Sequence, residues 1–284
     1  MQHAMRILRS CPGAGIIAAA MLLKLLKSIL PHSSPPAPAA PPPEDPARIL
    51  LREHQRMSQL ALPGPNYMET LAAVHALLKP RTYLEIGVEF GRTLALAAPL
   101  TRAIGVDPAP KVNVPLGSNA RVFALTSDDF FAQTDVTHEF GGLPVELAFI
   151  DGMHHFEFAL RDFIAIERLC SRDSTILMHD TFPIDRMTAE RKRKSIFWSG
   201  DTWRALLALK KYRPDLAIYT ISAPPTGITL IRRLDPTSRV LSERLGEIVA
   251  EFHALDFSVL ESADKRATLN VVPNEPAHLG ALLA

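Results

Sequence analysis

The stretch Tyr83–Gly91, YLEIGVEFG, decides the fold of this chain. We expect a buried strand over Tyr83–Ile86 and a turn bracketed by Gly87 and Gly91. Because Gly87 carries no side chain, it permits a sharp turn and a close approach of a ligand. Arg92–Leu100 has helix-forming composition, and the free N–H groups at the start of a helix favour negative charge. A strand, a glycine turn and a helix predict the first half of a nucleotide-binding βαβ unit.

The second half of this unit follows directly. Ala103–Val106 is another apolar run, and it ends at Asp107, which is placed to accept hydrogen bonds from a ribose diol. A dinucleotide fingerprint needs G-x-G-x-x-G, but Glu89 stands where its middle glycine would be. Together with Glu85, Glu89 would disfavour a pyrophosphate and suit a ligand with an ammonium group. The alternative is that both acids only stabilise the turn and the helix start.

The pattern E-x-G-x-x-x-G resembles the first motif of the class I S-adenosylmethionine (SAM) methyltransferases. The resemblance implies that the acid and the glycines line the amino-acid end of SAM. It also implies that Asp107 holds the ribose and that an acid after the third strand, which we expect over Arg121–Leu125, contacts the adenine amine. The cofactor-binding residues expected on this basis are Glu85, Gly87, Gly91, Asp107, Ser127, Asp128 and Asp151. For Ser127 and Asp128 an ordinary helix cap is the alternative.

Composition limits the other classes of protein. A chain of 284 residues with 47% hydrophobic residues suits one large α/β domain with extensions. A net charge of +1 gives no basic field, so we do not expect nucleic acid as a partner. Cys11 and Cys170 provide no disulfide framework, and Cys170 is expected as a reduced core residue in a helix.

The chain divides at a proline-rich stretch. Residues 31–46 hold eight prolines, which exclude helix and sheet and predict an extended linker. Residues 1–30 combine arginines with an apolar run, the outline of a signal or anchor, but lysines interrupt the run. We expect a cytoplasmic protein and leave open membrane contact through residues 1–30. Residues 47–235 would form the SAM-binding domain, and residues 236–284 a C-terminal helix over Pro236–Phe257 and a loosely held tail.

The remaining strands predict the sheet. Val145–Ile150 and Ser174–Met178 are strands separated by a helix over Phe156–Leu169, which indicates a parallel sheet covered on both faces. The runs 216–221 and 228–231 are joined too closely for a crossover helix, so they must be antiparallel. The predicted fold class is therefore α/β. It is a Rossmann-like class I methyltransferase fold with a mostly parallel seven-stranded sheet, ending in an antiparallel hairpin, and helices on both faces.

Polar side chains gather where the fourth and fifth strands end. The segments FIDGMHH and ILMHDTF place five residues at one rim: Asp151, His154, His155, His179 and Asp180. These motifs resemble methyltransferase family 24, over roughly residues 65–235. The resemblance implies SAM as cofactor. This family is similar to the small O-methyltransferases and to antibiotic- or sugar-modifying methyltransferases. We predict Asp151, His154, His179 and Asp180 as catalytic residues, and His155 as a helix-start residue.

Two mechanisms fit these residues. Asp151 and Asp180 could hold Mg²⁺, which would lower the pKa of an acceptor hydroxyl. Alternatively, His154 or His179 removes the proton as general base without a metal. Metal-dependent relatives often carry a carboxylate or amide beside the strand-five acid, and His179 departs from that pattern. Asp151 as a helix cap and Asp180 as a loop residue bonding its own backbone are the structural alternatives.

The acceptor pocket is predicted from neighbouring residues. Trp198 and Asp201 could supply an aromatic wall and a polar handle for the substrate. Alternatively, Asp201 caps the next helix and Trp203 is core. The basic run 191–194 is either a solvated loop or an attractor of an acidic acceptor, and Tyr67 could close over the cofactor.

The sequence thus predicts a SAM-dependent methyltransferase that methylates a hydroxyl of a small molecule or glycan, with a homo-oligomer left open. Two alternatives come from other classes. A nicotinamide-dependent oxidoreductase is disfavoured by the missing glycine and by the terminal hairpin. A SAM-fold protein that binds a partner without catalysis would have little need of acids and histidines at both strand ends.

Overall fold

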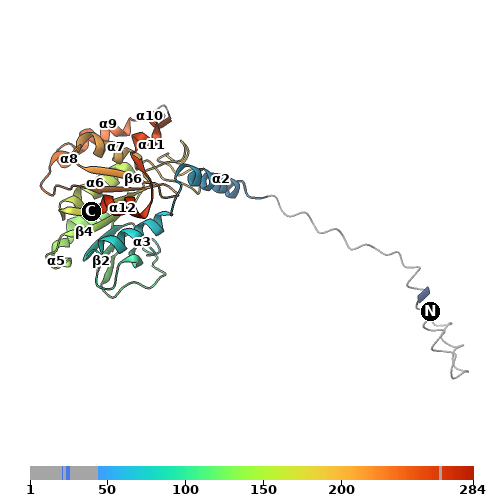
Figure 1. The fold of residues 1–284 in the computed structure, drawn as a ribbon, viewed down its shortest axis with the longest axis horizontal. Helices are drawn as coiled ribbons and strands as arrows, with labels where there is room; N and C mark the ends of the chain where they lie inside the picture. The colour runs from blue at the N-terminus through green and yellow to red at the C-terminus, as the bar shows by residue number, and fades with distance from the viewer. Residues whose placement is uncertain (1–20, 22–23, 26–43, 262–263) are drawn as a thin grey trace, which may run out of the picture. The chain divides into compact units, whose positions relative to one another are not determined.

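The computed structural model describes residues 21, 24–25, 44–261 and 264–284. The chain forms two units, Met1–Pro43 and Glu44–Ala284, and the second contains the sheet (Figure 1). Our expectations for the linker and for the signal or anchor fall almost entirely outside the described residues. Of the helices in the described part, none has both the length and the apolar character needed to cross a membrane.

One sheet of eight strands forms the centre of the second unit. Its order is β3-β2-β1-β4-β5-β7-β6-β8. Strands β3, β2, β1, β4 and β5 are parallel to one another, β7 is antiparallel to both β5 and β6, and β8 is parallel to β6. The strands are β1 Thr82–Ile86, β2 Arg102–Val106, β3 Ala120–Phe123, β4 Val145–Ile150, β5 Cys170–His179, β6 Ala217–Ile221, β7 Ile228–Arg232 and β8 Val271–Val272. The predicted mostly parallel sheet with an antiparallel end is confirmed, with one strand more than expected.

Helices cover both faces of this sheet, as predicted. The described helices are α2 Pro46–Ala61, α3 Tyr67–Leu78, η1 Leu94–Leu96, α4 Ser127–Gln133, α5 Val136–Glu139, α6 Phe156–Glu167, α7 Trp203–Tyr212, α8 Val240–Glu243, α9 Leu245–His253, α10 Ser258–Glu261, α11 Lys265–Thr268 and α12 Pro276–Leu283. On one face, α6 and α7 bury residues such as Phe163 and Leu206 in the larger core cluster. On the other, α3 and α12 bury Leu71 and Leu279 in a second cluster.

The start of α3 shows how local sequence sets these elements. The Asn66 side chain accepts a hydrogen bond from the Glu69 amide, and the Glu69 carboxylate accepts one from the Asn66 amide. This reciprocal capping satisfies two donors that a helix start leaves free. At the other end, Lys79 is left-handed with φ 46°, immediately before Pro80 and β1. The helix therefore delivers the chain directly into the first strand.

Four predicted details are wrong. The helix expected over Arg92–Leu100 is only the short 3₁₀ turn η1, since Pro99 disfavours helix before it and the Thr93 hydroxyl donates to Glu85. Cys170 is a buried free cysteine, but it begins β5 and does not lie in a helix. The single helix expected over Pro236–Phe257 is divided into α8 and α9.

The fourth correction concerns the C-terminus, which is not a loosely held tail. It adds β8 to the sheet edge and then forms α12, whose residues Leu279 and Leu283 are buried. Buried leucines on a helix that packs against α3 give this segment a share of the core.

Candidate active site

A cavity of about 560 Å³ opens at the carboxyl ends of β4 and β5. Its lining comes from α2, α3, the glycine turn, the segments after β4 and β5, the loop before α7 and the turn between β6 and β7. The residues are Leu51, Gln55, Tyr67, Glu89, Asp151, Gly152, His154, His179, Asp180, Arg193, Ile196, Phe197, Trp198, Pro225 and Thr226. Ligands of parallel α/β sheets bind at this end of the strands, so the cavity is the candidate active site.

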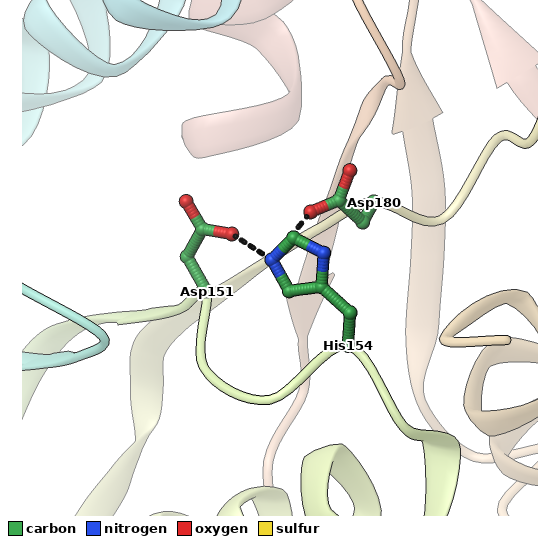
Figure 2. A group of neighbouring side chains, drawn as sticks. All are labelled: Asp151, His154 and Asp180. Atoms are coloured by element: carbon green, nitrogen blue, oxygen red, sulfur yellow. Dashed lines mark ion pairs between the residues drawn. The ribbon is translucent and has the colours of Figure 1, made fainter. Parts of the chain in front are cut away.

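Two carboxylates and two imidazoles meet at the floor of this cavity. Nε2 of His154 lies 3.4 Å from Asp151 Oδ1 and 3.1 Å from Asp180 Oδ2. Figure 2 marks both ion pairs with dashed lines. Nδ1 of His179 lies 3.1 Å and 3.2 Å from the same two oxygens. The convergence arises because β4 and β5 are parallel neighbours, with Ile150 paired to Met178. The structure therefore brings together all four residues predicted as catalytic.

Two of these residues have an uncommon backbone. His154 has φ 57° and Asp180 has φ 58°, both in the left-handed region that side chains other than glycine seldom adopt. Residues held in sparsely populated conformations occur preferentially at functional sites. Oδ2 of Asp180 is also buried without a hydrogen-bond partner, although two histidine nitrogens lie near it. Neither feature has a signal in the sequence.

Charge pairing outweighs burial in the pKa values of this cluster. Burial by itself would raise the pKa of Asp151, but the nearby His179 charge and hydrogen bonds from both histidines lower it. Burial would likewise lower the pKa of His154, but Asp180 and Asp151 raise it to about 9. The same two carboxylates raise the pKa of His179 well above its ordinary value, against the effect of burial. The two carboxylates thus favour the protonated form of each imidazole.

His179 is held from several sides. Its ring packs against Tyr67, with centroids 4.5 Å apart, and its Nε2 lies 3.4 Å from the Thr226 hydroxyl. Burial is the main cause that raises the pKa of Tyr67 to about 12, so its phenol stays neutral at physiological pH. Tyr67 therefore lines the cavity on the His179 side.

The structural alternatives for the two acids find no support. The first amide of α6, that of Phe156, is bonded by Asp201 and not by Asp151. His155 begins α6 as expected, and its Nε2 contacts the carbonyl of Arg191. The Asp180 carboxylate faces His154 and His179 from the end of β5.

The two residues predicted to contact the substrate, Trp198 and Asp201, differ in their access to the cavity. Trp198 lines the cavity and stacks on His154, with centroids 5.2 Å apart and planes at 21°. Asp201 is fully buried and accepts from Phe156 N, Arg191 and Arg204. It cannot meet a substrate here, so its predicted role as a polar handle is wrong, and it instead fixes the start of α6. Trp203 is a core residue, 1% exposed.

The basic run 191–194 is likewise divided between two roles. Arg191 is bound by Glu157 and Asp201 and belongs to the supporting structure. Lys194 pairs with Glu190. Arg193 lines the cavity, and its guanidinium lies over the Trp198 ring, 5.9 Å from the centroid. Of these residues, Arg193 is the one placed to reach an acceptor.

The glycine turn has the predicted backbone. Gly87 has φ +91° and Gly91 has φ +79°. A Cβ at Gly87 would lie 1.9 Å from the carbonyl oxygen of Asp151, so this glycine permits contact with the neighbouring strand end. The close approach at Gly87 is therefore made by the protein's own backbone. At Gly91 a Cβ would meet Val112 at 3.1 Å.

The two glutamates of this turn occupy opposite environments. Glu85 is 0% exposed, and its carboxylate accepts hydrogen bonds from Tyr83 and Thr93. Burial raises its pKa to about 8. Contact between Glu85 and a ligand ammonium is therefore excluded in this structure, which corrects the prediction. Glu89 lines the cavity and is the acid of this turn that a ligand can reach.

The other predicted cofactor residues lie outside the cavity lining. The Asp107 carboxylate accepts from the amides of Val88, Glu89 and Ala109, and so holds the glycine turn. Asp128 pairs with Arg161 of α6. The cap of α4 is Thr126, and not Ser127 or Asp128. Asp151 is the one member of the predicted cofactor set found in the lining.

Sequence reasoning missed part of the cavity wall. Leu51 and Gln55 project from α2, and Pro225 and Thr226 come from the turn between β6 and β7. The Ser58 hydroxyl of α2 donates to the carbonyl of Pro225, which joins these two parts of the wall. A helix that follows a proline-rich stretch carries no motif for this role, because its position depends on contacts distant in the chain.

The residues at the floor fit a divalent cation. One ligand atom each from Asp151, His154 and Asp180 lies within 4.8 Å of the others. The buried, unpartnered Asp180 oxygen belongs to this group. Two carboxylate oxygens and one imidazole nitrogen form a donor set for a divalent ion, although Mg²⁺ favours oxygen alone.

The sheet order, with antiparallel β7 between β5 and β6, defines a Rossmann-like class I methyltransferase fold. Residues 84–181, from β1 to just beyond β5, match a family model described as a methyltransferase domain. Over residues 84–181 the chain is therefore similar to methyltransferase family 24, and this match supports a SAM-dependent methyltransferase.

Solved structures provide further likenesses. The chain is 16% identical to the SAH-bound methyltransferase PaMTH1 of Podospora anserina, with a TM-score of 0.45, covering 80% of this chain and 99% of that one. The chain is 15% identical to the O-methyltransferase TomG of Streptomyces achromogenes, with a TM-score of 0.44, and the match covers 68% of this chain and 92% of that one. It is also 15% identical to an O-methyltransferase of Bacillus cereus, with a TM-score of 0.43, and the match covers 74% of this chain and 96% of that one. No curated protein matches the chain.

Proposed function

We propose that this methyltransferase transfers the methyl group of SAM to a hydroxyl of a small molecule or glycan. The observation that supports this most is the meeting of Asp151, His154, His179 and Asp180 at the floor of one cavity. A hydroxyl is a weak nucleophile until it loses its proton, and these groups can orient it and take up that proton.

SAM would occupy the side of the cavity next to the glycine turn. Its ammonium would meet Glu89, and its sulfonium would lie near Asp151, since both acids line this side. Opposite charges attract strongly where a cleft excludes water. Tyr67 would lie over the cofactor from α3, in keeping with its contact to His179.

The acceptor would occupy the side formed by α2 and the loop before α7. Leu51, Ile196 and Phe197 provide apolar surface there, while Gln55 and Arg193 provide polar groups. A cavity of about 560 Å³ is within the range of small-molecule sites. The acceptor hydroxyl would then lie against the carboxylates at the floor.

Removal of the acceptor's proton depends on how the side chains at the cavity floor are positioned by their neighbours. His179 donates to Asp151 from the buried side and fixes its carboxylate. Trp198 covers the outer face of His154 and limits the access of water. A divalent cation held by Asp151, His154 and Asp180 would lower the pKa of a bound hydroxyl. Because methyl transfer from a sulfonium needs little beyond alignment and a deprotonated acceptor, these contributions suffice.

Calorimetry with the full chain tests the cofactor. We expect SAM and S-adenosylhomocysteine to bind in the micromolar range and NADH not to bind. A folded chain that binds neither sulfur compound would overturn the proposal, and NADH binding would favour the oxidoreductase alternative.

Turnover tests the catalytic part of the proposal. The full chain is incubated with SAM, divalent cations and a panel of catechols, phenols and sugars, and S-adenosylhomocysteine is measured. We expect release with at least one hydroxyl acceptor, and strong loss of release in Asp151→Asn. SAM binding without release for any acceptor would favour the non-catalytic binding protein.

A further inference from the structure

We infer that the methyl acceptor carries an anionic group, a carboxylate or a phosphate, and that Arg193 binds this group and so determines acceptor specificity. The inference names the substrate class of the proposed function and rests on it for the place of the methylated hydroxyl. Binding of an anion at Arg193 can be measured without methyl transfer.

Arg193 differs from its basic neighbours in its partners. Arg191 pairs with two carboxylates, and Lys194 lies 2.7 Å from a carboxylate oxygen of Glu190. Arg193 lines the cavity, and among the residues that the structure describes it has carbonyl oxygens but no carboxylate as partners. Its positive charge is therefore left for a ligand to neutralise.

The Arg193 guanidinium is already oriented. Its Nε donates to the carbonyl of Ser195 at 3.2 Å, and its Nη2 donates to the carbonyl of Ile196 at 2.8 Å. Within the described part of the chain, its Nη1 makes no hydrogen bond. A guanidinium fixed in this way loses little side-chain freedom on binding, and its planar fork suits the oxygens of a carboxylate or phosphate.

Trp198 connects this guanidinium to the floor of the cavity. The His154 ring stacks on Trp198 with centroids 5.2 Å apart, and the guanidinium of Arg193 lies 5.9 Å from the same Trp198 centroid. The two groups therefore cannot be farther apart than these two distances placed end to end. A monosaccharide or a substituted benzene ring can bridge such a span, with its hydroxyl at the floor and its anionic group at Arg193.

The charges of the cavity are divided between its two sides. Glu89 is the acid on the side next to the glycine turn, where the SAM ammonium would bind. At the floor, each of the two carboxylates lies 3.1–3.4 Å from histidine nitrogens. On the acceptor side, the other described lining residues are apolar or, like Gln55, neutral, so Arg193 supplies the charge there. An anionic acceptor thus meets a positive group with no competing acid beside it.

Calorimetry of the full chain saturated with S-adenosylhomocysteine tests the inference with two matched pairs of compounds. The first pair is para-hydroxybenzoate and para-hydroxybenzamide, and the second is glucose 6-phosphate and glucose. The pairs separate a carboxylate from a phosphate. In at least one pair we expect the anion to bind about tenfold more tightly than its neutral partner. Because Arg193 is exposed, this preference should decrease as salt is added.

Substitutions at position 193 assign the preference to this side chain. Arg193→Gln should reduce the anion-to-neutral affinity ratio by about five- to tenfold. Arg193→Lys keeps the charge but not the planar fork, so its ratio should lie between those of the wild type and Arg193→Gln. Lys192→Gln is the matched control, because Lys192 is exposed, adjacent in the chain and outside the cavity lining. It should keep the wild-type ratio, and thermal unfolding checks that each variant is folded.

Turnover provides a second measurement of the same preference. With SAM as methyl donor, the kcat/KM values for the anionic and neutral member of the preferred pair should give a ratio that falls in Arg193→Gln and is unchanged in Lys192→Gln. A residue that only supports the loop would change both members alike and leave this ratio constant.

The outcomes distinguish this inference from the proposed function. Equal binding within both pairs, no binding of any of the four compounds, or an anion preference that survives in Arg193→Gln would each overturn the inference. Methyl transfer to neutral hydroxyls without an anion preference would overturn the inference and leave the proposed function intact. The titrations are repeated without S-adenosylhomocysteine. Anion binding that is lost in Arg193→Gln, in a chain that binds no SAM, would support the anion site and overturn only the function.

Discussion

The strand ends of β1 and β2 and those of β4 and β5 carry the same type of residue with opposite fates. Glu85 and Asp107 have their carboxylates bonded to neighbouring side chains and to backbone amides. Asp151 lines the cavity, and Asp180 keeps a buried oxygen without a partner. The hydrogen-bond donors around an acid at a strand end therefore decide its role. An acid whose carboxylate is fully hydrogen-bonded supports the structure, and an acid left open to the cavity is available for catalysis. Four predictions break or sharpen this contrast.

The largest effect is expected where the two regions touch. Gly87→Ala would place a Cβ 1.9 Å from the Asp151 carbonyl oxygen, at a backbone φ of +91°. We expect a loss of about 3–5 kcal/mol in unfolding free energy, measured by chemical denaturation. Gly117→Ala is the control, because a Cβ there meets no atom within 4 Å. Equal stability of the two variants would contradict the close packing of the glycine turn.

Removing charge at the cavity should change catalysis more than stability. Asp151→Asn keeps the shape of the side chain but removes the negative charge between His154 and His179. We expect methyl transfer to fall by about 10²–10⁴-fold, measured as S-adenosylhomocysteine release with an acceptor from the screen. Thermal unfolding is followed in parallel. Retained activity, or inactivity explained by unfolding, would remove Asp151 from the chemistry.

Glu85 should influence stability and its pH dependence. Burial raises its pKa to about 8, so between about pH 4.5 and pH 8 the unfolded chain releases this proton while the folded chain keeps it. Stability attributable to Glu85 is therefore full at low pH and falls as the pH rises. Between pH 5 and pH 7 we expect the wild type to lose about 2–3 kcal/mol relative to Glu85→Gln.

Denaturation at both pH values checks this difference, with Glu243→Gln at an exposed position as the control. A Glu85→Gln variant with the same pH dependence as the wild type would mean that Glu85 is ionised in the folded protein. In either case methyl transfer should change little, which separates Glu85 from Asp151.

The smallest effect is expected from the two tryptophans. Trp198→Phe shortens the ring that stacks on His154, and we expect about a fivefold loss in kcat/KM, since such contacts contribute about 1 kcal/mol. Trp203→Phe lies in the core and should reduce stability while leaving kcat/KM nearly unchanged. The opposite pattern in the two variants would reverse their assigned roles.

Sequence patterns predicted the order of elements because these depend on local chemistry. Val145–Ile150 has the predicted bounds, and the two glycines predicted to bracket a turn, Gly87 and Gly91, both have a positive φ. The meeting of Asp151 with Asp180 also followed, because parallel neighbouring strands end at one edge of a sheet. The prediction of a helix over Arg92–Leu100 was wrong, because Pro99 and the hydrogen bond from Thr93 to Glu85 oppose a helix there.

By itself, the sequence determined the fold class, the glycine turn and the residues at the floor of the site. Tertiary structure alone decided which polar groups remain available for chemistry. The Asp201 carboxylate is hydrogen-bonded by Arg191 and Arg204, and the Glu85 carboxylate is buried and hydrogen-bonded by Tyr83. Helix α2 supplies part of the cavity wall. The physical reason is that burial and hydrogen-bond satisfaction depend on neighbours far away in the chain, whereas strand and turn propensities depend on neighbours close by.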